Sequence, residues 1–148
     1  MYTDVLLATD GSDCARDATA HAIDIATTYD ATLHALYVIE TRIGYDSGII
    51  DPEMVERKLR SEGEAILDEV ESAVRDRNGE VVSTIRRGIP EREIVDYVEE
   101  QDIDLVVLGV RGRSEFKTVL LGSTSETVVR ELSIPVVLMT ESDPDGVR

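Results

Sequence analysis

The sequence predicts a single doubly wound, Rossmann-like α/β domain with a five-stranded, mostly parallel sheet and helices on both faces. Short apolar runs alternate with segments whose apolar residues recur at helical spacing, and turn-forming residues separate the two. The 148 residues can bury roughly 68–70% of the unfolded surface as one domain, and no Pro-, Gly- or Ser-rich linker divides them. We assign residues 1–141 to the domain and residues 142–148 to a polar C-terminal tail.

The N-terminal third predicts a strand, a helix and a second strand. Residues 4–10, DVLLATD, and 31–40, ATLHALYVIE, are apolar runs bounded by turn formers, which favours two strands. Between them the apolar residues recur at helical spacing. This set comprises Ala15, Ala18, Ala22, Ile25, Ala26 and Tyr29.

A long second helix is predicted between residues that favour a helix start and residues that favour a helix end. Asp51 is a good N-cap and Pro52 suits the first helical position, while Asn78 and Gly79 favour an end. Gly63 weakens this helix without ending it. Residues 81–85, VVSTI, then predict a third strand.

The C-terminal half predicts two further helix and strand pairs. Pro90 begins a short helix, and the continuously apolar residues 104–110, DLVVLGV, predict a fourth strand covered on both faces. A last helix contains Val128, Val129 and Leu132, and residues 134–139, IPVVLM, predict the fifth strand.

The connections predict where a ligand would bind. Right-handed crossovers leave few arrangements, and we predict the strand order 3-2-1-4-5. The topological switch then falls between the first and fourth strands, and ligands of such sheets bind beyond the carboxyl ends of those strands. In this sequence those ends are Asp10 and Gly109.

The composition is strongly acidic. The 31 acidic residues outnumber the 15 basic ones, for a formal net charge of −16. Such a surface repels nucleic acid and anionic membranes, and no apolar run is long enough to span a bilayer. Without a recognisable export signal, we expect a cytoplasmic protein. The acid excess, with few lysines and few large aromatic residues, is typical of a salt-loving microbe.

Cysteine and histidine predict no metal site. Cys14 is the single cysteine, which excludes an internal disulfide and a multi-cysteine zinc site, and we expect it to be a half-buried helix residue. His21 and His34 have no companions at ligand spacing, so we expect core or surface histidines.

The glycines of residues 109–126, GVRGRSEFKTVLLGSTSE, predict an anion-binding loop. Gly109, Gly112 and Gly122 allow backbone N–H groups to approach a ligand closely. The N-terminus of the last helix adds unpaired N–H donors and a favourable dipole. Together these features could wrap a polyphosphate.

The polar side chains of this loop each have two interpretations. Arg111 and Arg113 either pair with phosphate oxygens or lie on a solvated loop. The hydroxyls of Ser123, Thr124 and Ser125 either cap the last helix or donate to the phosphates.

The spacing GxxG, nine residues and then GS resembles the ATP-binding signature of the universal stress protein family. The resemblance extends over nearly the whole chain, through VLLATDGSDCARDATAHAIDIA, LYVIE, RRGIPEREIVDYV and DLVVLGVRGRSEFKTVLLGSTSETVVRELSIPVVLM. It implies that Asp10 contacts the nucleoside, that the backbone of Val38 reads the adenine edge and that Ala8 lines the ribose.

The same resemblance implies ATP as the ligand, with or without Mg²⁺. Its ribose and phosphates would be enclosed by glycines and hydroxyl residues of the loop, namely Gly109, Gly112, Gly122, Ser123 and Thr124. Two features depart from the family pattern: ELSIPV lacks the cysteine often found before that proline, and residues 41–50 match nothing in particular.

Other phosphate-using classes fit less well. A phosphoacceptor receiver domain needs an aspartate after the third strand and a lysine after the fifth, where this chain has RRG and TES. A P-loop protein needs a glycine-lysine-Ser/Thr ending, and a dinucleotide enzyme needs a glycine fingerprint after the first strand. The sequence has neither.

Two functions remain. The chain is either an ATP-binding regulator of a stress response, which changes its association with an unidentified protein partner, or a slow ATPase or phosphotransferase using the same site. The glycine-rich loop has no recognisable general base or water-positioning residue, so we favour the regulator and predict no catalytic residues. We also expect a homodimer, because residues 134–140 form an uncharged, apolar edge strand.

Overall fold

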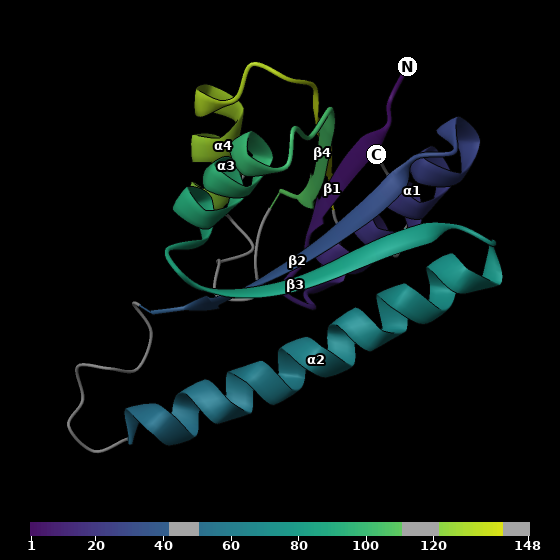
Figure 1. The fold of residues 1–148 in the computed structure, drawn as a ribbon. Coiled ribbons are helices and arrows are strands. Elements are labelled where there is room, and N and C mark those ends of the chain that lie inside the picture. The colour runs from purple at the N-terminus through teal and green to yellow at the C-terminus, as the bar shows by residue number, and fades with distance from the viewer. Residues whose placement is uncertain (42–50, 111–121, 141–148) are drawn as a thin grey trace, which may run out of the picture.

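The structure is a computed structural model that describes residues 1–41, 51–110 and 122–140. Five strands form one sheet in the order β3-β2-β1-β4-β5, and every neighbouring pair is parallel (Figure 1). The predicted fold class and strand order are therefore confirmed. In chain order the elements are β1 (Asp4–Ala8), α1 (Asp13–Tyr29), β2 (Thr32–Glu40), α2 (Pro52–Asp76), β3 (Glu80–Gly88), α3 (Pro90–Glu100), β4 (Leu105–Gly109), α4 (Ser123–Glu131) and β5 (Val136–Met139).

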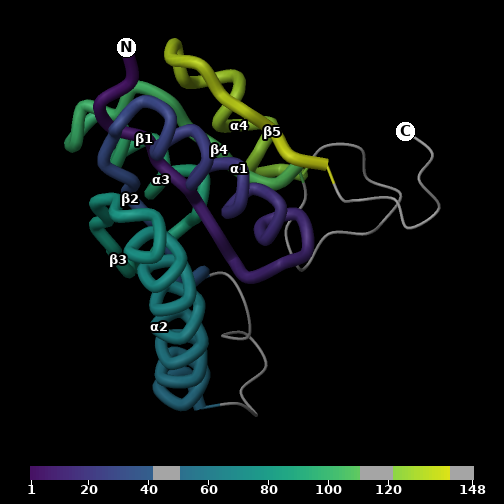
Figure 2. Tube along the Cα trace, turned by 90° about the vertical axis from the view of Figure 1, so that its right-hand side faces the viewer, coloured from purple at the N-terminus to yellow at the C-terminus, as the bar shows by residue number. Residues whose placement is uncertain are grey.

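The two faces of the sheet carry separate hydrophobic cores. Helices α1 and α2 cover one face, and α3 and α4 cover the other (Figures 1 and 2). Successive residues of β1 serve opposite cores, because side chains alternate along a strand. Val5 and Leu7 pack with α1 and α2, whereas Leu6 packs with α3 and α4.

Helix α2 begins and ends where the sequence predicted. The Asp51 side chain accepts a hydrogen bond from the Glu53 N–H, and Pro52 is the first helical residue. At the other end Asn78 has a left-handed φ of 57°, and the Gly79 N–H donates to the Val74 carbonyl. Gly63 is buried inside this helix, and a Cβ added there would lie 2.5 Å from the ring of Tyr37.

Strand β3 is longer than the predicted residues 81–85, because it continues through two arginines to Gly88. The Arg86 guanidinium lies 4.9 Å from the centre of the Tyr97 ring and pairs with Glu93 and Glu100 of α3. These contacts hold polar residues in a strand whose hydrophobic pattern ends earlier.

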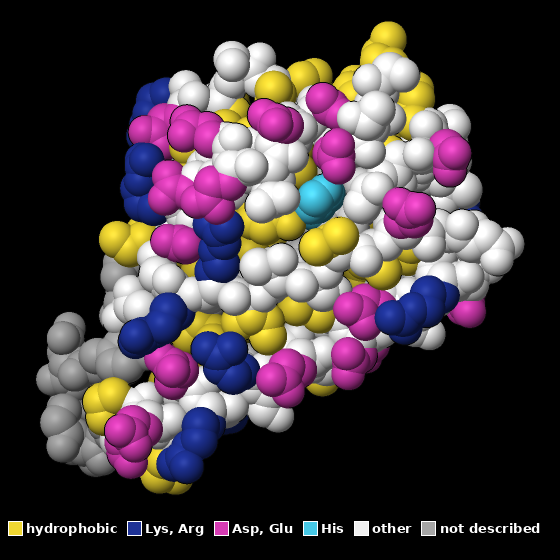
Figure 3. All heavy atoms as spheres, in the orientation of Figure 1, with side chains coloured by type: hydrophobic (Ala, Val, Ile, Leu, Met, Phe, Trp, Pro, Cys, Tyr) yellow, Lys and Arg dark blue, Asp and Glu magenta, His cyan; other side chains and the backbone are white. Residues whose placement is uncertain are grey.

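Acidic and basic side chains are interspersed over the face in Figure 3. Two arginines, for example, pair with acids from other elements: Arg87 with Glu56 at 2.9 Å and Arg92 with Glu131 at 3.0 Å. Exposed pairs of this kind contribute little to stability individually. They do show that part of the positive charge is neutralised locally.

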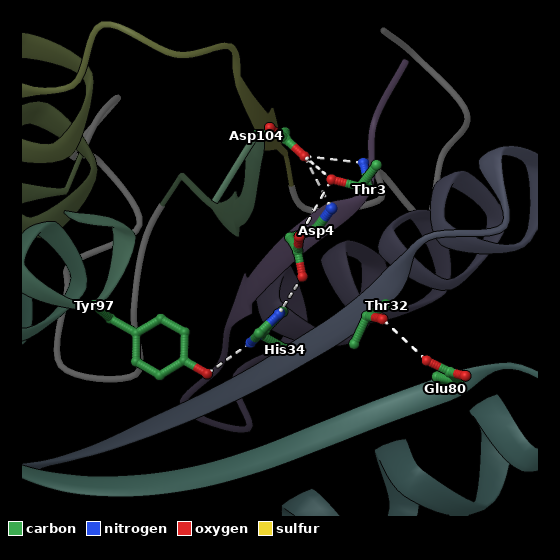
Figure 4. A network of polar contacts seen from close by, with 7 residues as sticks. All are labelled: Thr3, Asp4, Thr32, His34, Glu80, Tyr97 and Asp104. Carbon is green, nitrogen blue, oxygen red and sulfur yellow. Dashed lines mark hydrogen bonds and ion pairs between the residues drawn. The ribbon is translucent and has the colours of Figure 1, made fainter. Parts of the chain in front are cut away.

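A buried hydrogen-bond chain joins β1, β2 and α3 (Figure 4). His34 Nε2 lies 2.9 Å from Asp4 Oδ1, and Nδ1 lies 2.8 Å from the Tyr97 hydroxyl. A carboxylate only accepts, so in the neutral imidazole Nε2–H donates to Asp4 and Nδ1 accepts from Tyr97. Burial raises the pKa of the Tyr97 phenol, which keeps this hydroxyl protonated. No companion of His34 could be identified from spacing in the sequence, whereas two partners contact it in the structure.

The start of β1 is tied to the residue that precedes β4. Asp104 Oδ2 accepts three hydrogen bonds, from the Thr3 N–H at 2.9 Å, the Thr3 hydroxyl at 2.8 Å and the Asp4 N–H at 3.0 Å (Figure 4). The backbone and side-chain bonds from Thr3, followed by the bond from Asp4, lower the pKa of the Asp104 carboxyl.

Asp104→Asn should lower the free energy of unfolding at pH 7 by about 1 kcal/mol, because hydrogen bonds to a charged acceptor are replaced by weaker ones at an exposed site. The folded-state pKa is depressed, so the contribution is complete above the unfolded pKa of about 4 and is lost as the pH falls through the folded value. Urea unfolding from pH 7 to pH 2.5 measures it.

The matched control is Asp102→Asn, which removes the same charge at an exposed position whose left-handed backbone, φ 51°, asparagine also tolerates. A difference between wild type and Asp104→Asn that stayed constant down to pH 2.5 would contradict the assignment.

Candidate nucleotide-binding site

The carboxyl edge of the sheet is uneven at the switch point. β1 ends at Ala8, and its last contact with β2 is the hydrogen bond from the Thr9 N–H to the Leu36 carbonyl, at 3.0 Å. β2 continues beyond this bond to Glu40, paired only with β3. Among the described residues, no strand lies beside the last part of β2 on the β1 side.

This arrangement determines where the backbone of Val38 points. Along a strand, the N–H and C=O groups of alternate residues face the same neighbour. Since the Leu36 carbonyl faces β1, the N–H and C=O of Val38 face that side too, beyond the end of β1. Val38 therefore presents an adjacent donor and acceptor to the switch point.

The loop after β1 is held by its own side chains. The Thr9 hydroxyl accepts from the Gly11 N–H at 3.2 Å, and Asp10 Oδ1 accepts from the Ser12 N–H at 2.9 Å. Gly11 has φ +80°, which favours glycine, and the Ser12 hydroxyl caps α1 by accepting from Ala15. β1 ends two residues earlier than the predicted 4–10, and the hydrogen bond from the Ser12 N–H holds the Asp10 carboxylate in the loop directly after the strand.

The end of β4 and the N-cap of α4 are joined by a backbone hydrogen bond. The Val110 N–H donates to the Met139 carbonyl at 3.0 Å, and the Val110 carbonyl accepts from the Gly122 N–H at 2.7 Å. Val110 and Gly122 are therefore hydrogen-bonded neighbours beside β5. This bond places the first turn of α4 close to the end of β4.

The N-cap of helix α4 is Gly122, not a hydroxyl residue. Gly122 is the N-cap and offers no side-chain acceptor, so no side chain caps the helix. The Ser125 hydroxyl donates to the Gly109 carbonyl at 2.8 Å, and the Thr124 hydroxyl donates to Glu91 of α3 at 3.3 Å. The capping interpretation of these hydroxyls was therefore wrong for both.

Gly109 has a packing role that the sequence did not reveal. A Cβ added there would lie 2.6 Å from Cys14 Cβ, 2.9 Å from the Cys14 carbonyl carbon and 3.1 Å from the Ala15 nitrogen. The end of β4 thus packs directly on the backbone of α1. Cys14 is only 4% exposed, which corrects the expectation of a half-buried residue.

The structure brings most of the predicted site residues to one edge of the sheet. They come from the ends of β1, β2 and β4 and the start of α4, and are Ala8, Asp10, Val38, Gly109, Gly122, Ser123 and Thr124. Arg111, Gly112 and Arg113 lie outside the described residues. Within the described ranges, no group of three or more His, Cys, Asp or Glu residues could hold a metal ion.

The fold and this edge define a doubly wound α/β domain with a candidate ligand site at its switch point. The model of the universal stress protein family matches residues 1–139. The chain therefore belongs to the universal stress protein family.

Individual relatives agree with this assignment. The chain is 30% identical over 141 residues to universal stress protein MJ0531 of Methanocaldococcus jannaschii, covering 94% of this chain and 82% of the relative. It superposes on the structure of protein MJ0577, from the same organism, with a TM-score of 0.85 and 28% identity, covering 97% and 99% of the two chains. A universal stress protein solved in complex with cAMP has a TM-score of 0.70 and 25% identity, covering 95% and 98%.

None of the helices in the described part of the chain is long and apolar enough to cross a membrane.

Proposed function

We propose that this protein binds ATP at the carboxyl edge formed by β1, β2, β4 and α4, and acts as a nucleotide-dependent regulator of a stress response in the cytoplasm, where ATP is available. The observation that carries the proposal is the adjacent donor and acceptor of Val38, which lie beyond the end of β1. The relative solved with cAMP supports an adenine nucleotide as the class of ligand.

Val38 suits adenine better than guanine. A backbone N–H beside a C=O complements an acceptor beside a donor, and adenine offers a ring nitrogen beside its exocyclic amine. Guanine offers two acceptors, N7 and O6, on the corresponding edge. We therefore expect guanosine and GTP to bind much more weakly than adenosine and ATP.

The remaining residues suit the ribose and the phosphates. The Asp10 carboxylate can accept hydrogen bonds from ribose hydroxyls, and Ala8 lies beside it at the end of β1. The first turn of α4, which starts at Gly122, provides N–H donors and a positive dipole end for phosphate. Arg111, Gly112 and Arg113 are proposed phosphate contacts on the strength of the sequence resemblance.

A first experiment identifies the ligand directly. Denaturing the purified protein and analysing the released small molecules should yield an adenine nucleotide. Incubation with ATP for hours should release little phosphate. Steady turnover at this site would instead favour the slow ATPase or phosphotransferase.

Asp10→Ala should weaken the binding of adenosine and of ATP by a similar factor of about ten or more. The substitution removes charge-assisted hydrogen bonds to the nucleoside and none to the phosphates. Titration calorimetry with both ligands measures the two factors. Asp13→Ala is the matched control, since Asp13 is an exposed acid at the start of α1, three residues after Asp10, and pairs only loosely with Arg16 at 4.0 Å. Loss of ATP binding with full retention of adenosine binding would contradict this role of Asp10.

We also propose that residues 134–140 form a homodimer interface. In β5 the backbone groups of Val136 and Leu138 face away from β4, because the intervening residues pair with it. Val129 of α4 is 46% exposed, and apolar edges of this kind favour pairing. Light scattering should give the mass of a dimer, and Leu138→Lys should shift it toward a monomer. A monomeric wild type at molar salt would contradict the proposal.

A further inference from the structure

A carboxylate of α3 lies against the first turn of α4. The Thr124 hydroxyl, on the second residue of α4, donates to Glu91 Oε2 at 3.3 Å, and Glu91 is itself the second residue of α3. The next residue of α3, Arg92, forms two hydrogen bonds with Glu131 at the far end of α4. The two helices are thus joined by side-chain contacts at both ends of α4.

The Glu91 carboxylate lies at the end of α4 at which the phosphates would bind. A negative side chain near a helix N-terminus is attracted by the unpaired N–H groups and the positive end of the dipole. Phosphate is attracted to the same end. Two anions beside one helix N-terminus repel each other, and the repulsion grows with the charge of the second anion.

We propose that Glu91 is a specificity-determining residue of the nucleotide site, which weakens binding progressively as the number of phosphate charges increases. The inference rests on the proposed nucleotide site. Uncharged adenosine is not repelled by the Glu91 carboxylate. AMP is repelled weakly, and ATP is repelled most strongly. Mg²⁺ bound to the phosphates reduces their charge, so Glu91 also makes ATP binding more dependent on Mg²⁺.

Glu91→Gln tests this effect, because the amide oxygen can still accept the Thr124 hydrogen bond while the charge is removed. Titration calorimetry with adenosine, AMP and ATP, without Mg²⁺ and then with it, gives the affinity ratios. We expect ATP without Mg²⁺ to bind about tenfold more tightly to Glu91→Gln than to wild type. AMP should gain less and adenosine should not change. The gain for ATP should shrink when Mg²⁺ is present.

Two further variants separate the local charge from other causes. Glu126→Gln removes the same charge from the first turns of α4, where the carboxylate pairs with Arg130 at 3.5 Å, and controls for the general acidity of the chain. Thr124→Val removes the hydrogen bond and keeps the Glu91 charge, so it should not raise the affinity for ATP relative to adenosine.

The outcomes distinguish this inference from the proposed function. If adenosine does not bind to the wild type, the nucleotide site is wrong and the role of Glu91 fails with it. If adenosine binds and the ratio of ATP to adenosine affinity is the same in wild type and Glu91→Gln, only the role of Glu91 is overturned. An equal rise in Glu126→Gln, or a rise in Thr124→Val, also overturns it.

Discussion

Gly122→Val should abolish ATP binding, with a loss of at least about a hundredfold, while the fold survives. Gly122 is the N-cap of α4, and its N–H donates to the Val110 carbonyl. A branched side chain here would stand where phosphate must approach the N–H groups of the first turn. The backbone, at φ −69° and ψ 160°, lies in the β region that valine adopts readily. Because no side chain caps the helix now, the substitution should cost α4 only about 1 kcal/mol.

Calorimetry and circular dichroism together decide this prediction. Gly122→Ala is the graded control, since a single methyl group should weaken ATP binding less than valine does. Unchanged ATP affinity in a folded Gly122→Val protein would mean that the glycine spacing is structural and that the ATP assignment is mistaken.

Gly109→Ala should act through stability. The added methyl group would meet Cys14 and the Ala15 nitrogen at distances of 2.6 to 3.1 Å, and two of these three contacts are with backbone atoms of α1. Strand and helix would have to separate, and overpacking of this kind costs about 1–3 kcal/mol. For a domain of this size that corresponds to a fall in melting temperature of very roughly 3–10 °C.

Thermal unfolding of wild type, Gly109→Ala and Gly122→Ala tests this distinction. We expect the larger fall for Gly109→Ala. An unchanged melting temperature in Gly109→Ala would show that β4 and α1 can move apart at little cost. The two glycines belong to one sequence signature, yet the structure indicates a different reason for glycine at each position. Gly109 is needed for packing, whereas Gly122 leaves room for the ligand.

The strand order could be predicted from the sequence because the signals were local and consistent. Each strand was an apolar run, each helix had its own periodicity, and α2 had clear signals at Asp51, Pro52 and Asn78. Right-handed crossovers then left few arrangements. The position of the candidate site followed from the strand order, since Asp10 lies two residues beyond the end of β1 and Gly109 ends β4 at the switch point.

What could not be predicted depends on contacts between distant parts of the chain. His34 finds Asp4 and Tyr97, 30 and 63 residues away, and no spacing rule connects them. The extension of β3 depends on Arg86 meeting α3. The hydroxyl of Ser125 turns to the Gly109 carbonyl rather than to its own helix. These partners become visible only when the elements are packed.

The glycine inside α2 has a consequence for anyone who would engineer this protein. Replacing a helix glycine by alanine is a common route to greater stability, because alanine reduces the freedom of the unfolded chain and favours the helix. At Gly63 the new methyl group would lie 2.5 Å from the almost completely buried Tyr37 ring, so the ring or the helix would have to shift. A design chosen from helix propensity alone would therefore select a position at which this contact opposes the expected gain.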